Sequence, residues 1–151
     1  MDWFVRAFLR ASLAWLALGV TLGVAMAVHP AWLLYRPAHL HMNLIGFVTM
    51  MIFGVAYHVV PRFTGRGLHS RALAGAQFWM CNAGLAAMVA GFVVRPHLPA
   101  PGTMALVAGG TLEAIGAYAF AYNVWRTLGP AVPAAPARAP ATRPLPVHPA
   151  P

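Results

Sequence analysis

The chain has 151 residues, of which 60% are hydrophobic and only 8% are charged. A soluble globular domain carries about 25% charged residues, so this composition excludes an ordinary soluble protein and indicates an integral membrane protein. Ten arginines and no lysine stand against two acidic residues, and the resulting net charge of +8 raises the question of a nucleic-acid partner. The arginines stand singly at the ends of apolar runs and form no basic patch, so we expect no nucleic-acid binding.

Four apolar runs, each long enough at roughly 20 residues to cross a bilayer, follow one another along the chain. We expect one all-α domain, an integral membrane four-helix bundle over residues 1–128. A disordered Pro/Ala-rich cytoplasmic tail is expected at 129–151. An alternative for the first run is a cleaved signal peptide, because arginines precede it and Ala25-Met26-Ala27 has the small residues of a cleavage site. The expected spans are about 11–34, 39–60, 72–94 and 101–125.

The arginines also predict the orientation of the four spans. Eight of them fall on one side of the membrane, and only Arg36 and Arg95 fall on the other. The positive-inside rule therefore places both termini in the cytoplasm, and we expect a multi-pass protein of a bacterial-type inner (plasma) membrane. This orientation puts four histidines at the outer side (His29, His39, His41 and His97) and two at the inner side (His58 and His69).

The second span carries the most informative residues, within RPAHLHMNLIGFVTMMIFGVAYHVVPR at 36–62. Ionisable side chains are expensive in lipid, and histidine is the commonest nitrogen ligand for a metal or a heme iron. His41 and His58 are separated by roughly 25 Å along a helix axis, so they cannot share one metal. His39 and His41 are two residues apart, so on a helix they point to nearly opposite sides.

The two outer histidines of this span lead onto different helix faces. Small or polar residues follow His39 and favour close packing against another helix. Branched apolar residues follow His41 and suit lipid or a flat apolar ligand such as a porphyrin. The alternative for each histidine is a polar anchor in the headgroup layer. The first face consists of Asn43, Gly46, Met50 and Gly54, and the second of Ile45, Val48 and Ile52.

Glu113 lies in the middle of the fourth run, where a carboxylate is costly unless it is paired or protonated. Our first interpretation is a protonated glutamate that is hydrogen-bonded to Gln77 or Asn82 of the third run. The alternatives are a proton-relay position and a partner for the edge of a heme. Cys81 is the only cysteine, which excludes an intrachain disulfide and a thiolate-rich metal site.

These residues resemble a known family. His41-Met42-Asn43, followed by an apolar run that ends Ala56-Tyr57-His58-Val59-Val60-Pro61-Arg62, resembles the second transmembrane helix of the catalytic subunit of heme–copper oxidases. The nitric oxide reductase and cbb-type oxidase branches are nearest, and the similarity extends over roughly residues 36–128. It implies that a histidine at the start of this helix is an axial ligand of a low-spin heme b. The HxN pattern favours His41 as the ligand to the heme iron and the helical face favours His39, while His58 is a third cofactor-binding candidate.

The chain also departs from that family. It has no counterpart of the paired histidines that hold copper, of the tyrosine near them, or of the later heme histidines. One copy therefore cannot build an oxygen- or nitric-oxide-reducing centre, and we expect no oxidase or reductase activity from the chain on its own. The second heme ligand would come from His29, His97 or a second subunit.

Three functions compete at this point. The first is a small membrane heme-b-binding protein with an electron-transfer, sensing or accessory role in respiration. Such a protein would act as a homo-oligomer or with subunits of a respiratory complex. The second is a cofactor-free membrane subunit or assembly factor of such a complex. The third is a copper- or nitric-oxide-responsive membrane protein that uses the outer histidines.

Overall fold

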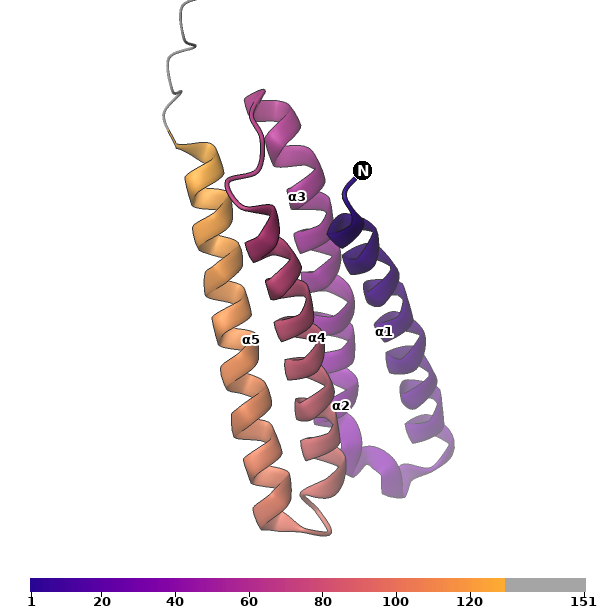
Figure 1. Ribbon diagram of the computed structural model, residues 1–151. Helices are drawn as coiled ribbons and strands as arrows, with labels where there is room; N and C mark the ends of the chain where they lie inside the picture. The colour runs from indigo at the N-terminus through magenta and orange to yellow at the C-terminus, as the bar shows by residue number, and fades with distance from the viewer. Residues whose placement is uncertain (130–151) are drawn as a thin grey trace, which may run out of the picture.

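The computed structural model describes residues 1–129, and this part of the chain is helical and contains no strand. Four of its helices are long and apolar enough to cross a membrane, which confirms the all-α fold class with four spans (Figure 1). They pack side by side as an up-and-down bundle, with the N-terminus and the end of the last helix at the same end. The tail predicted at 129–151 lies, from residue 130 onward, outside the described residues.

The first helix, α1 (Trp3–Val28), begins and ends earlier than the span expected at 11–34. The α-helix stops at His29, and Pro30 then opens a 3₁₀ turn, because a proline has no N–H to continue the preceding helix. The second membrane-length helix runs from Pro30 to Thr64. It joins four segments, which are η1 (Pro30–Tyr35), α2 (Arg36–His41), η2 (Met42–Thr49) and α3 (Met50–Thr64).

The segment η2 is a π-helix and follows His41 directly. The hydroxyl of Thr49 donates to the carbonyl of Leu44, five residues back, at 2.9 Å. This spacing fits the wide turn of a π-helix. π-Helical turns are rare in proteins and occur frequently at functional sites. The regular α-helix is therefore interrupted directly after the two histidines His39 and His41.

The turn between α3 and α4 (Arg71–Val94) is built by local backbone chemistry and tied to α5 (Pro99–Leu128). Gly65 has φ 64°, a left-handed conformation that glycine adopts without strain, and it ends α3. Ser70 caps α4 by accepting from the Leu73 amide at 3.1 Å. The side chain of Asn123 accepts from the Ser70 amide at 2.9 Å and donates to its carbonyl at 2.8 Å, which fixes the turn on α5.

Helices α4 and α5 pack closely because glycines recur in their interface every seven residues. A repeat of seven keeps a residue on the same side of a helix over two turns. A Cβ atom added to Gly84 would lie 2.9 Å from the carbonyl oxygen of Gly109, so the two backbones are in direct contact. The repeat consists of Gly84 and Gly91 on α4, and Gly102, Gly109 and Gly116 on α5.

An aromatic cluster fills the bundle at the end where the chain begins. Phe4 and Phe8 of α1 are fully buried there, and Phe8 meets Phe78 of α4 edge to face with ring centroids 5.2 Å apart. Phe53 of α3 lies 4.3 Å from Phe120 of α5, again between ring centroids. All four long helices contribute a ring, so this cluster positions α1 against the other three.

Candidate functional site

His39 is held against α1 at the end of the bundle opposite the aromatic cluster. Its Nδ1 lies 2.8 Å from the carbonyl oxygen of Gly19. A carbonyl only accepts, so Nδ1 carries the proton and donates, and in the neutral ring Nε2 keeps a lone pair. A Cβ atom at Gly23 would lie 2.8 Å from Cε1 of this ring, so the glycine makes the room in which the imidazole sits.

Asn43 supports the same contact one turn along. Its side-chain amide donates to the carbonyl of His39 at 2.8 Å. It also lies on Gly19, where a Cβ atom would come 2.6 Å from Nδ2 of Asn43. The small and polar face predicted below His39 therefore packs against α1, and Gly54 on the same face contacts Phe8.

His41 points to another part of the bundle. Its Nδ1 lies 2.8 Å from the carbonyl oxygen of Pro37 and donates to it, so His41 also presents Nε2 as the unprotonated nitrogen. Its ring lies against Phe92 of α4, with centroids 4.7 Å apart and planes at 45°. The two histidines thus face different helices, as their spacing predicts, and they do not form a joint site.

A cavity of about 380 Å³ lies near His41, although His41 is not one of its lining residues. Pro37 and Phe92, which both contact the His41 ring, belong to its wall. Its lining is apolar except for the guanidinium of Arg95, and within residues 1–129 no acidic side chain takes part. The full lining is Leu34, Pro37, Phe92, Arg95, Pro96 and Pro99.

These residues fit a heme b. A histidine whose Nδ1–H is bound to a backbone carbonyl is the usual form of an imidazole that ligates a metal through Nε2. Flat apolar side chains such as Phe92 suit the face of a porphyrin, and Arg95 suits its carboxylate groups. The donor set is therefore compatible with heme at His41. His39 also has an unprotonated Nε2, but its ring is packed beside Gly23 of α1.

The other outer histidines have different neighbours. His29 lies beside Trp32, with ring centroids 5.5 Å apart, and His97 shares a hydrogen bond of 3.1 Å with the hydroxyl of Tyr35. Among the described residues, no group of three or more His, Cys, Asp or Glu side chains is placed to hold a metal ion. The outer histidines that the copper hypothesis needs are therefore not gathered into one site.

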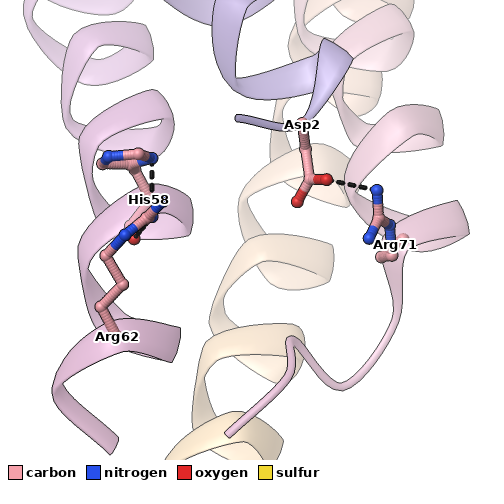
Figure 2. A network of polar contacts seen from close by, with 4 residues as sticks. All are labelled: Asp2, His58, Arg62 and Arg71. Atoms are coloured by element: carbon pink, nitrogen blue, oxygen red, sulfur yellow. Dashed lines mark hydrogen bonds and ion pairs between the residues drawn. The ribbon is translucent and has the colours of Figure 1, made fainter. Parts of the chain in front are cut away.

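His58 lies at the opposite end of the second helix (Figure 2). A guanidinium nitrogen of Arg62 donates to Nδ1 of His58 at 2.8 Å and to its backbone carbonyl at 2.6 Å. Because arginine only donates, Nδ1 must accept, so the proton sits on Nε2, the reverse of His39 and His41. His58 lines a separate cavity of about 260 Å³, near the ion pair between Asp2 and Arg71.

Glu113 occupies the α4–α5 interface, where Cys81 is its neighbour. The expected hydrogen bond to Gln77 or Asn82 is wrong. Gln77 faces α3 and accepts from the hydroxyl of Tyr57 at 2.5 Å. Asn82 is turned toward α1, where it accepts from the indole N–H of Trp15 at 3.2 Å. Within residues 1–129, Oε1 of Glu113 and Nε2 of Gln77 are buried without a hydrogen-bond partner.

Some site residues are not evident from the sequence. Gly19 and Gly23 read as ordinary glycines of an apolar helix, although their spacing of four is the pattern of a face where membrane helices approach closely. Phe92 and Arg95 read as the end of the third span. Their role depends on α4 and α2 lying side by side, which no local pattern encodes.

The fold and the site define a class: a multi-pass helical membrane protein with two oriented histidines at one end of its second helix. Comparison with known proteins identifies the family. The family model for cytochrome c and quinol oxidase polypeptide I matches residues 33–132, and the chain belongs to this family. The predicted relation to heme–copper oxidase subunit I is confirmed.

Two curated relatives show how much of the family's subunit is represented. The chain is 28% identical to the Cbb3-type cytochrome c oxidase subunit CcoN1 of Stutzerimonas stutzeri, over 84% of the chain and 33% of the relative. It is 29% identical to cytochrome c oxidase subunit 1 of Rhodobacter capsulatus, over 60% of the chain and 22% of the relative. It therefore spans a third of one relative and less than a quarter of the other. Members of the family bind heme.

Proposed function

We propose that the chain binds heme b at the outer end of its second helix, with Nε2 of His41 as the iron ligand. The observation that carries this proposal is an oriented imidazole whose two neighbours, Pro37 and Phe92, line an apolar cavity together with Arg95. Bound heme would supply one-electron redox chemistry, and the role of the protein would be electron transfer, sensing or an accessory function in respiration.

The neighbours of His41 support this assignment. The hydrogen bond from Nδ1 to the Pro37 carbonyl fixes the tautomer and the ring orientation. Phe92 packs against the imidazole and limits its rotation. Arg95 would pair with a heme carboxylate at the membrane surface, where its charge is also solvated.

His39 is the alternative iron ligand. It has the same tautomer, but its ring is already seated on α1 beside Gly23, so it serves the packing of the bundle. A second axial ligand is needed for a low-spin heme. Since His97 is engaged with Tyr35, we propose that this ligand comes from a second copy of the chain or from a respiratory-complex subunit.

The cofactor content of the purified protein tests the proposal. Protein from heme-replete cells is expected to give a b-type pyridine hemochrome spectrum. His41→Ala should abolish this spectrum, while the matched variants His39→Ala and His58→Ala should retain it. Loss of heme in His39→Ala alone would move the ligand to His39. A colourless wild-type protein that co-purifies with a respiratory complex would instead support a cofactor-free subunit or assembly factor.

We also propose a bacterial-type inner membrane location with both termini in the cytoplasm. Six of the eight arginines in residues 1–129 belong to the end of the bundle where the chain begins, and Arg36 and Arg95 belong to the other end. The positive-inside rule supports the assignment of the arginine-rich end to the cytoplasm. A reporter that reveals its side of the membrane should give a cytoplasmic signal both when it is fused at residue 1 and when it is fused after Gly129. An external signal from either fusion would contradict the proposal.

A further inference from the structure

The cavity beside His58 lies between the start of α1, the end of α3 and the beginning of α4, and has a volume of about 260 Å³. Part of its wall is apolar and consists of Val5, Pro61 and Leu68. The charged side chains that line it are Asp2, Arg62 and Arg71. The cavity therefore combines apolar surface with charged groups at one end of the membrane helices (Figure 1).

The charges of this cavity do not cancel. Asp2 and Arg71 form an ion pair, so each neutralises the other (Figure 2). Arg62 lies on α3 and is paired with His58, which is neutral because its Nδ1 accepts a hydrogen bond. Among the described residues, the side chains of this wall therefore keep one net positive charge, that of Arg62.

His58 orders the guanidinium of Arg62 without neutralising it. Nη1 of Arg62 donates both to Nδ1 of His58, at 2.8 Å, and to the His58 carbonyl, at 2.6 Å. Within residues 1–129, these hydrogen bonds of Arg62 all use Nη1. The other edge of the guanidinium, formed by Nε and Nη2, carries two parallel N–H donors of the kind that bind an oxyanion in a bidentate manner. The proton of His58 is on Nε2, which adds another donor to the wall.

We propose that Arg62 and His58 bind the phosphate group of an anionic membrane phospholipid in this cavity. The free edge of the guanidinium matches two phosphate oxygens in geometry and charge. An anionic headgroup is favoured over a zwitterionic one, because Asp2 is already paired and offers no partner to a headgroup ammonium.

Free inorganic phosphate shares this chemistry, but the surroundings favour the lipid. Trp3 and Phe63 follow Asp2 and Arg62 in the chain and are 50% and 87% exposed. Acyl chains would cover such side chains, whereas soluble phosphate would leave them in water. An exposed tryptophan at the end of a membrane helix is also typical of the headgroup region.

Energy transfer from the tryptophans of the protein to a fluorescently labelled phosphatidylglycerol tests this site in mixed micelles. Unlabelled phosphatidylglycerol is expected to displace the label at least tenfold more effectively than unlabelled phosphatidylcholine. Arg62→Gln should lower this preference about tenfold, as expected for the loss of charge-assisted hydrogen bonds. Micelles of a neutral detergent keep the measurement free of the attraction that a charged bilayer surface exerts on every arginine.

Arg6→Gln is the matched control, since it removes one exposed positive charge from the same end of the bundle but outside the wall of the cavity. It should leave the preference unchanged within twofold. An equal loss in both variants would overturn the proposal, because it would show a general charge effect of the whole end. Displacement of the label by millimolar inorganic phosphate at constant ionic strength would assign the cavity to a soluble phosphate and overturn the lipid assignment. A wild-type protein without any preference would also refute it.

Discussion

The contact between α4 and α5 makes a strong prediction for the substitution Gly109→Ala. A Cβ atom at this position would lie 2.5 Å from the carbonyl oxygen of Gly84 and 2.7 Å from the amide nitrogen of Met88. Both are backbone atoms, so neither can rotate away. Non-bonded heavy atoms rest about 3.5 to 4.0 Å apart, which means that the two helices would have to separate by about 1 Å.

The cost of this separation can be isolated with the neighbouring residue. Overpacking of a close interface costs about 1–3 kcal/mol, while replacing glycine by alanine inside a helix gains up to about 1 kcal/mol of intrinsic propensity. Gly110→Ala has the same gain in helix propensity. Apart from its chain neighbours and its own helix backbone, no described atom lies within 4 Å of the added Cβ. The difference between the two variants should therefore equal the steric term alone, and Gly109→Ala should be less stable by about 1–3 kcal/mol.

Reversible unfolding in mixed micelles, in which the fraction of a denaturing detergent is raised and helicity is followed by circular dichroism, measures this difference. Gly109→Ala should unfold at a lower detergent fraction than Gly110→Ala. Equal midpoints, or a more stable Gly109→Ala, would refute direct backbone contact between α4 and α5. The seven-residue glycine repeat would then have no structural role at this interface.

Two further substitutions test other contacts. Tyr57→Phe removes a buried hydrogen bond and should lower the free energy of unfolding by about 1–3 kcal/mol, whereas Tyr118→Phe, at a ring that is 76% exposed, should change it little. Equal stability of these two variants in the same detergent titration would contradict the hydrogen bond. Gly23→Ala places a Cβ 2.8 Å from the His39 ring and should displace that imidazole while the heme spectrum persists, since His41 is the proposed ligand. A hemochrome that disappears in this variant would favour His39.

The number and nature of the helices follow from the sequence because a membrane imposes a strong length requirement. A run of roughly 20 apolar residues has few alternatives to a spanning helix. The first boundary is less predictable, because apolar character continues through Trp32 and Leu34 into a 3₁₀ turn that belongs to the next helix. Hydropathy does not distinguish a continued α-helix from a 3₁₀ turn, whereas the missing N–H of Pro30 does.

The directions of the two outer histidines are predictable, but their partners are not. A spacing of two residues on a helix separates His39 from His41 whatever surrounds them. That Gly19 accepts from one and Phe92 contacts the other depends on the rotation and register of α1 and α4 against the second helix. The same reason explains Glu113, whose hydrogen-bonding expectation assumed that Gln77 faces α5 when in fact it faces α3.

The packing also bears on which histidine is free to act as a ligand. Along the contact with α1, a large group on one helix meets a glycine on the other, and His39 is the large group that fills the place at Gly23. Moving its imidazole toward an iron would open that contact and expose the Gly19 carbonyl, so ligation by His39 would weaken the bundle. His41 does not pack against α1 in this way, because its hydrogen bond lies within its own helix turn and its ring contacts Phe92, which lines a cavity. Ligation through its Nε2 would leave the α1 contact intact, so the proposed assignment lets His39 serve the packing and His41 the cofactor.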